Sequence, residues 1–238
     1  MNKYLKIRND VRNDIISGKY KPGELLPNEN DFTAIYNTSK MTVKHAMDEL
    51  VREGLIIKRR GSGTFVKELN QQELESLKVA SQFQGTTALY PNKKIKSDVL
   101  VFELVLPSRK LMDELHVNAL EKLYHVRRVR TIDNVPFVIE DIYMPADIIK
   151  DLTLSICESS IYEYIEDQLK LSLGSAHRKI EARKVTEEER GYLELEPGEP
   201  VVVSSQVAFL SDGRAFESSQ SIHRADHFAF ETVIIRRV

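Results

Sequence analysis

Two lysines one helical turn apart are the first residues in the sequence whose type and spacing suit a specific chemistry. Lys40 and Lys44 share one face of the segment 39–52, and Thr42 and His45 lie on its outward side. Cations repeated once per turn suit nucleic-acid phosphates, and hydroxyl and imidazole groups can contact base edges. A solvated helix can carry the same face, so the lysines alone do not distinguish a DNA-contacting helix from an ordinary surface helix.

Two arginines at alternate positions of a predicted strand form a second group. Because alternate strand residues share a face, Arg128 and Arg130 start about 7 Å apart and point the same way. Like charges this close favour an anion between them or an acid beside them. Ser159 and Ser160 open a predicted helix whose free N–H groups also favour an anion. Separately these residues suit an exposed strand and a helix cap, but together they predict a phosphate pocket.

Catalysis is the alternative use of the polar side chains in the same part of the chain. His177, His223 and Glu217 have the chemistry of a general acid or base, but no two of them lie at a spacing that indicates a catalytic pair. The lone Cys157 excludes a disulfide framework and a cysteine metal cluster. We therefore expect no enzymatic activity, no metal and no cofactor.

A small helical domain must position the two lysines. Apolar residues at helical spacing predict three helices, over 3–17, 28–36 and 39–53. Asn28 suits the N-cap of the second helix, and either Thr38 or Ser39 suits the N-cap of the third. Phe32 and Ile35 are expected to face inward from the second helix. The short link between the second and third helices predicts a helix-turn-helix.

A glycine-rich hairpin follows the third helix. Two short strands, in 55–60 and 64–69, enclose the turn Gly61-Ser62-Gly63. Glycine lets backbone approach a sugar-phosphate chain without an intervening side chain, and Lys58, Arg59 and Arg60 add charge near the tip. The hairpin therefore predicts a wing beside the helix-turn-helix.

Charge is divided unevenly along the chain. Residues 1–67 carry 13 Lys and Arg against 8 Asp and Glu, whereas the remainder carries 21 against 28 and the formal net charge is only −2. This asymmetry is expected when one domain alone faces a polyanion. No apolar run is long enough to span a membrane, and the first ten residues lack the apolar segment of a signal peptide. We therefore expect a cytoplasmic protein.

The rest of the chain predicts a largely antiparallel sheet with helices packed on it, an α+β domain. Period-two apolar patterns bounded by turn residues indicate strands within 97–106, 123–145, 175–185, 201–223 and 228–238. Helical patterns occur at 107–116, which opens with a proline, and at 159–171 and 186–195.

The first 66 residues resemble the winged helix-turn-helix of the GntR family. The tracts PGELLPNE, SKMTVKHAMDEL, EGLI and GSGTFV occur in the family order and spacing. The resemblance implies DNA contacts at Asn30, Ser39, Lys40, Thr42, Lys44, Gly61 and Thr64. We add His45, because it faces outward from the same helix, and Ser62 and Gly63, because they belong to the wing turn. The family usually has arginine where this chain has Asn30, Lys40 and Lys44. Lysine keeps the charge but loses the bidentate contact with guanine, so we expect weaker contacts or another base preference.

The tracts LYHVRRVRTIDNVPFVIEDIYMP, SIYEYIEDQLKL and FLSDGRAFESSQSIHRADHFAFE resemble the effector (UTRA) domain of HutC-type GntR regulators. That domain has the chorismate-lyase-like fold and binds small ligands, often phosphorylated sugars. The resemblance implies effector contacts at Arg128, Arg130, Glu140, Ser160, Tyr162, Glu217 and His223, and weaker candidates at Thr86 and Thr87. ICESSIYEYIEDQL is most similar to repressors of trehalose utilisation, although regulators that respond to amino-sugar phosphates share nearly the same residues.

The turn near Asp133 decides whether Glu140 can join this pocket. A two-residue loop, Asp133-Asn134, would place Glu140 on the sheet face opposite to Arg128. A three-residue loop ending at Val135 would place Glu140 directly across from Arg128, as the resemblance requires, and asparagine tolerates the left-handed position of such a loop. We predict the three-residue loop.

These observations predict a winged helix-turn-helix at 1–67, a linker at 68–84 and an effector-binding and dimerisation domain at 85–238. The expected function is a homodimeric transcriptional repressor of a sugar-utilisation operon, released from double-stranded operator DNA by a phosphorylated sugar. The apolar strand at 201–210 and the tail at 233–238 are candidates for the dimer surface, although both also suit a core. Three alternatives remain open at this point: a sensor of a non-phosphorylated metabolite, an enzyme acting on a small acid or sugar phosphate, and a constitutive DNA binder.

Overall fold

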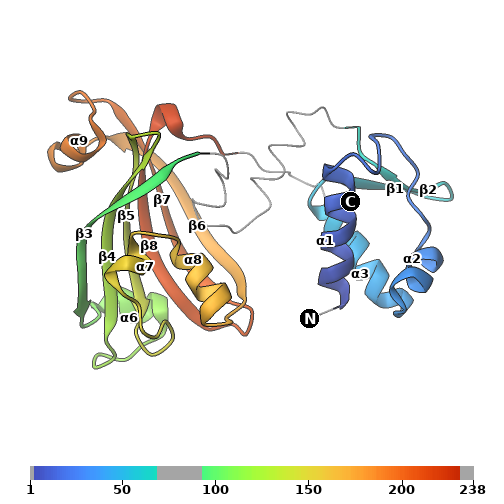
Figure 1. Ribbon diagram of the computed structural model, residues 1–238, viewed down its shortest axis with the longest axis horizontal. Helices are drawn as coiled ribbons and strands as arrows, with labels where there is room; N and C mark the ends of the chain where they lie inside the picture. The colour runs from blue at the N-terminus through green and yellow to red at the C-terminus, as the bar shows by residue number, and fades with distance from the viewer. Residues whose placement is uncertain (1–2, 69–92, 231–238) are drawn as a thin grey trace. The chain divides into compact units, whose positions relative to one another are not determined.

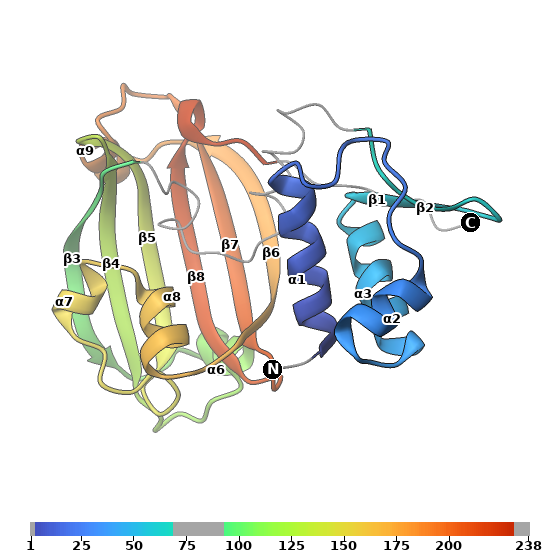
Figure 2. The same cartoon turned by 45° about the vertical axis from the view of Figure 1, so that its right-hand side comes forward.

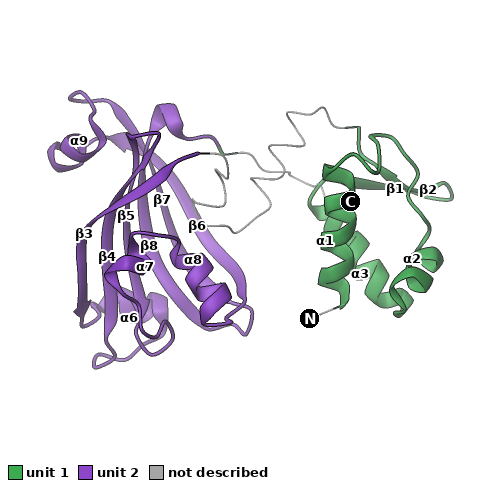
Figure 3. Ribbon diagram, in the orientation of Figure 1, with its two compact units in different colours: residues 1–82, 230–238 green, residues 83–229 purple. Residues whose placement is uncertain are grey.

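The computed structural model describes residues 3–68 and 93–230, and the chain divides into two compact units (Figures 1 and 3). One unit comprises residues 1–82 with 230–238, and the other comprises residues 83–229. Most of the predicted linker and the tail at 233–238 lie outside the described residues, so the domain limits stay a prediction. No helix in the described ranges is long and apolar enough to cross a membrane.

The first unit is a three-helix bundle with a two-stranded hairpin, as predicted. Its elements are α1 (Lys3–Ile16), α2 (Glu29–Tyr36), α3 (Lys40–Arg52), β1 (Ile56–Arg59) and β2 (Gly63–Val66). The apolar stripe of α3 is fully buried, and it packs against apolar residues of α1 and the hairpin. Figure 2 shows α1 and α3 side by side, with β1 and β2 extending beyond them as the wing.

Local hydrogen bonds fix where α2 and α3 begin. The Asn28 side chain accepts from the backbone N–H groups of Asn30 and Asp31 at 2.8 and 3.1 Å, and the Asp31 carboxylate accepts from the Asn28 N–H at 2.9 Å. This is the predicted capping box. At α3 the cap is Ser39, whose Oγ accepts from the N–H of Thr42 at 3.2 Å.

The predicted inner face of α2 is partly wrong. Phe32 is buried, but Ile35 is 65% exposed. Tyr36 packs beside Phe32 instead, with ring centroids 6.3 Å apart. Residues four apart on a helix are only about 40° out of line, whereas residues three apart diverge by about 60° in the other direction. The short helix therefore turns Tyr36 toward the core and Ile35 away from it.

The second unit is a six-stranded antiparallel sheet in the order β3-β4-β5-β8-β7-β6 (Figure 2). Its strands are β3 (Ile95–Val105), β4 (Leu123–Ile132), β5 (Val135–Pro145), β6 (Leu173–Lys184), β7 (Pro200–Leu210) and β8 (Ala215–Arg224). One face packs against α7 (Leu154–Cys157) and α8 (Ile161–Glu163), which continues as a π-helical turn, Tyr164–Gln168. The other face packs against α6 (Arg109–Leu115) and α9 (Glu187–Leu193).

Two smaller expectations change at the ends of elements, and one open alternative is narrowed. Ser108 is the N-cap of α6, so Pro107 precedes the helix and is not its first residue. After β8 the chain makes a 3-10 turn, Ala225–His227, and residues 228–230 are not in a strand, so the described part of the last predicted strand is wrong. Val201, Val203, Ala208 and Leu210 of β7 are buried within the unit, which favours core over dimer surface for that strand.

The β4–β5 loop differs from our prediction, although the resulting register agrees with it. The loop has two residues, Asp133 and Asn134, both with positive φ (52° and 70°), and Ile132 pairs with Val135. An extra residue, Phe137, then shifts the register between the pairs Thr131–Pro136 and Arg130–Val138. Proline has no N–H to donate to the ladder, which makes this point of the strand suitable for a bulge. The bulge, not the loop, places Glu140 opposite Arg128.

Candidate DNA-binding surface and effector site

A groove of about 1020 Å³ opens between the start of α2, the start of α3 and the wing. Six of the ten predicted DNA-contacting residues line it: Asn30, Lys40, Gly61, Ser62, Gly63 and Thr64. The structure therefore brings residues more than thirty positions apart in the chain to one surface. At the starts of α2 and α3, the first-turn N–H groups that Asn28 and Ser39 do not cap suit phosphate oxygens at its edge.

The outward face of α3 carries the other predicted contacts, and they are not equivalent. Lys44 is exposed, whereas the Thr42 hydroxyl lies 2.9 Å from Ser39 Oγ at the helix start. His45 is exposed, as predicted, but its ring also lies against Tyr4 of α1, with centroids 4.2 Å apart, and its Nε2 is 3.7 Å from Glu49. The structure thus places His45 beside α1 within the domain.

The wing tip depends on two glycines in the left-handed region. Gly61 has φ +75° and Gly63 has φ +112°, and a Cβ at Gly63 would lie 2.8 Å from Leu25 Cδ1. Lys58 does not carry its charge to the tip, because its Nζ lies 2.8 Å from Asp48 and 3.6 Å from Glu29. Arg59 packs over the Phe65 ring, at 4.8 Å from the centroid. The tip charge is therefore smaller than the sequence indicated.

The candidate effector site begins with two buried arginines that share one buried acid. Arg128 Nε lies 2.7 Å from Glu140 Oε2, and Arg130 Nη1 lies 3.7 Å from Glu140 Oε1. The three residues are 4%, 3% and 7% exposed. Burial lowers the pKa of Arg130, against the opposing effect of Glu140. A buried set with two positive charges and one negative charge favours an added anion.

Arg128 also fixes the loop that precedes α8. Its Nη1 donates to the carbonyl oxygens of Cys157 and Ser159, the second at 3.1 Å. Ser160 is the N-cap of α8, and its Oγ accepts from the Glu163 N–H at 3.3 Å. Arg128 therefore ties the start of α8 to β4, which is a positioning role beyond the predicted ligand contact.

A second polar cluster lies on the same sheet face, around Glu217. Glu217 Oε1 accepts from Ser219 Oγ at 2.6 Å and from Gln206 Nε2 at 2.8 Å, and Gln206 also donates to the Tyr162 hydroxyl at 3.2 Å. Burial raises the pKa of Glu217 and raises that of Tyr162 well above its ordinary value. Carboxylate, amide and hydroxyl groups of this kind suit the hydroxyl groups of a sugar.

Gln206 and Arg178 are functional candidates that the sequence analysis missed. Arg178 Nε and Nη2 donate to Gln206 Oε1 at 3.0 and 2.7 Å, and the strand register places Arg178, Gln206 and Ser219 in one row across β6, β7 and β8. No local motif marks either residue. Only the pairing of three strands would have identified them.

His223 completes the described part of the site. It lies on β8, opposite Val138, which in turn is opposite Arg130, and its ring packs against Phe228 with centroids 4.9 Å apart. Burial lowers its pKa from 6.5 to about 4, so the imidazole is neutral at pH 7. Thr86 and Thr87, the other effector candidates, lie outside the described residues.

The low pKa of His223 predicts a loss of stability in acid. The unfolded chain binds the proton below about pH 6.5, whereas the folded chain binds it only near pH 4, so the free energy of unfolding falls as the pH is lowered between these values. The expected contribution is about 3 kcal/mol. Urea unfolding at pH 7 and pH 4.5 measures it, and His223→Gln should lose less stability than the wild type. An equal loss of unfolding free energy in the wild type and in His223→Gln would show that His223 is not the group responsible.

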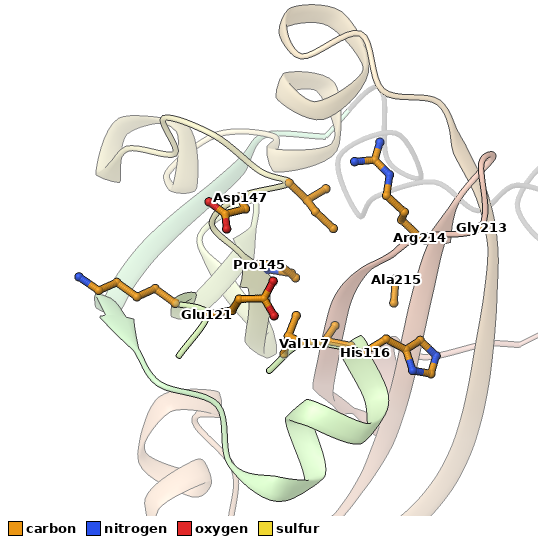
Figure 4. Close-up of a pocket in the computed structure, with 11 residues that line it drawn as sticks. His116, Val117, Glu121, Pro145, Asp147, Gly213, Arg214 and Ala215 are labelled. Carbon is orange, nitrogen blue, oxygen red and sulfur yellow. The ribbon is translucent and has the colours of Figure 1, made fainter. Parts of the chain in front are cut away.

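A separate cavity of about 280 Å³ lies at another part of the second unit and contains none of the predicted effector residues (Figure 4). Its labelled polar side chains include the carboxylates of Glu121 and Asp147. Arg214 also lines the cavity, but its guanidinium pairs with Asp212 at 2.8 Å. His116 and Lys122 also line the cavity but are exposed, so it is less suited to a phosphate than the site around the buried Arg128 and Arg130.

Comparison with known proteins identifies both units. Residues 3–66 match the bacterial regulatory proteins of the gntR family, and residues 91–229 match the UTRA domain. The chain is similar to the HTH-type transcriptional regulator GmuR of Bacillus subtilis, with 36% identity over 237 residues that cover 100% of both chains.

Two solved structures extend the comparison. The effector binding domain of the Bacillus subtilis trehalose repressor TreR is 35% identical, with a TM-score of 0.53, and covers 60% of this chain and 99% of that chain. The possible transcriptional regulator YydK from Bacillus subtilis has the same fold at 24% identity, with a TM-score of 0.80 and coverage of 96% and 99%. The protein therefore belongs to the GntR family and is a DNA-binding transcriptional regulator with a UTRA effector domain.

Proposed function

We propose that this protein represses a sugar-utilisation operon and leaves its operator when a phosphorylated sugar binds the UTRA domain. The observation that carries the proposal is the pair Arg128 and Arg130, buried together with Glu140 beside the cap of α8. A phosphate brings the negative charge that this set favours and accepts hydrogen bonds from arginine. Ser160 and the free N–H groups that follow it would bind the remaining oxygens.

The sugar would extend from the phosphate toward Glu217. Glu217, Ser219, Ser221 and His223 occupy alternate positions of β8, so the site follows the strand for about 20 Å from Glu217 to His223. Glu140 and Glu217 would accept from sugar hydroxyl groups, and Tyr162 and Gln206 would contact others. A site of this length accommodates the phosphate of a monosaccharide or of a disaccharide. Amino-sugar phosphates and trehalose-type phosphates are therefore both candidates.

Regulation requires that the ligand distinguish two states of the protein. A homodimer would place two copies of α3 on half-sites about one helical turn apart. The phosphorylated sugar would bind the state in which these copies are wrongly spaced, and only that difference in affinity can shift the population from DNA. The relative GmuR is named a transcriptional regulator, which favours ligand sensing over catalysis, and the proposed place of action is the cytoplasm.

A thermal-shift screen tests the ligand class. Glucose 6-phosphate, glucosamine 6-phosphate and trehalose 6-phosphate would each be compared with the corresponding free sugar. A ligand at a hundredfold excess over its Kd stabilises the folded state by about 2.7 kcal/mol. We expect this shift for at least one phosphate and a much smaller shift for its free sugar. Equal shifts for the two forms would refute the phosphate site.

A further inference from the structure

Met41 is a large apolar side chain that the structure leaves in solvent at the start of the recognition helix α3. It is 80% exposed, whereas the apolar residues of the same helix that form the core, Val43, Ala46, Met47 and Leu50, are at most 2% exposed. At 100° per residue, Met41 lies about 170° from the centre of that buried stripe. It therefore points directly away from the domain, beside Lys44 on the helix surface.

The other outward side chains of α3 already have partners within the domain. His45 lies against Tyr4, the Asp48 carboxylate pairs with Lys58 at 2.8 Å, and Arg52 pairs with Glu49. Within the described ranges, no hydrogen bond or ion pair is formed by the side chains of Lys40 and Lys44. Three side chains of this face, Lys40, Met41 and Lys44, thus remain to meet a DNA duplex.

These three side chains differ in what they can contact. The lysine ammonium groups suit phosphates or guanine acceptors. A thioether on a flexible chain is a poor hydrogen-bonding group and gains free energy by leaving water. In the major groove, the apolar group that a base edge presents is the C5 methyl of thymine. This chemistry points to an apolar contact with one base and not to a phosphate.

We propose that Met41 is a specificity-determining residue that recognises the C5 methyl group of a thymine in each operator half-site. The proposal rests on DNA binding by α3 and goes beyond it, because it names the base and the chemical group that are recognised. Lysine lacks the bidentate contact that arginine makes with guanine, so an apolar contact would give this helix a separate source of sequence preference. The lysines supply positive charge, and Met41 distinguishes thymine from bases that lack the C5 methyl group.

Deoxyuridine gives a direct test, since it lacks only the C5 methyl group. The full-length protein would first select its best duplex from a random DNA pool, and each thymine of that duplex would then be replaced in turn by deoxyuridine. For the wild type we expect one position per half-site at which the replacement weakens binding about fourfold, which is the effect of one buried methyl group. For Met41→Ala the same replacement should have no effect, and Met41→Leu should retain the sensitivity.

Salt dependence provides the matched control. Lys44→Ala should reduce the slope of log K against log salt concentration by about 1, whereas Met41→Ala should leave the slope unchanged. The proposal is overturned if the wild type tolerates deoxyuridine at every position, or if Met41→Ala keeps the same sensitive position. Failure to select any duplex would instead refute DNA binding by the domain, so the two failures are distinguishable.

Discussion

Replacing Arg130 with methionine should abolish the stabilisation of the protein by its sugar phosphate. The substitution keeps most of the buried side-chain volume but removes the guanidinium group, which lies 3.7 Å from Glu140. Glu140 would keep its contact with Arg128 at 2.7 Å, so the remaining pair is charge-neutral and no longer favours an anion. At a ligand concentration that stabilises the wild type by about 2.7 kcal/mol, the variant should show no measurable thermal shift.

Arg127 provides the matched control for this experiment. It precedes Arg128 on β4 but points to the other sheet face, where its Nη2 lies 2.8 Å from Glu188 of α9. Arg127→Met removes an arginine from the same strand and should leave the ligand-induced shift intact. Loss of the shift in both variants would mean that general damage to β4, and not a phosphate contact, explains the result.

Replacing Arg128 should have the largest effect on stability. Arg128→Met leaves the Glu140 carboxylate without its closest cation and removes the donor from the Cys157 and Ser159 carbonyl groups. Breaking a buried ion pair from one side costs about 3–5 kcal/mol. Chemical denaturation of the UTRA domain should show a loss of this size, and Arg127→Met should show less than about 1 kcal/mol, since it removes a surface pair.

A double substitution distinguishes the ion pair from the packing of the arginine side chain. If the loss in Arg128→Met comes from the isolated acid, adding Glu140→Leu should recover part of it, because an apolar pair of similar volume often replaces a buried ion pair at little cost. Additive losses in the double variant would show that the contacts of Arg128 with the loop before α8 dominate. Ligand binding should be absent in both cases.

The first unit was predictable because its signals are local. Buried Val43 and Leu50 recur at helical spacing, Asn28 forms the capping box that its neighbours indicated, and Gly61 has the positive φ that the wing turn requires. Ile35 was misplaced because helical spacing cannot decide between the i+3 and i+4 neighbours of Phe32. That choice depends on how α2 crosses the core, which is a tertiary property.

The candidate effector site was only partly predictable because it is assembled across strands. Alternation along β4 correctly placed Arg128 and Arg130 on one face, and the resemblance indicated Glu140. The register that brings Glu140 to Arg128 comes from a bulge at Phe137, and not from the three-residue loop that the strand pattern predicts. Gln206 and Arg178 carried no local signal, because their role follows from the order β8-β7-β6. A sequence pattern therefore indicates which sheet face a side chain lies on. The side chains that it contacts on neighbouring strands depend on the strand order and register.

The most direct test of this account is the affinity for a selected operator duplex with and without the sugar phosphate identified by thermal shift. Fluorescence anisotropy at fixed salt concentration would give both Kd values. We expect saturating ligand to weaken DNA binding at least about fivefold, and the DNA to weaken ligand binding by the same factor. In Arg130→Met the operator Kd should not respond to the sugar phosphate. An identical operator Kd with and without a ligand that demonstrably occupies the UTRA domain would contradict the proposed mechanism.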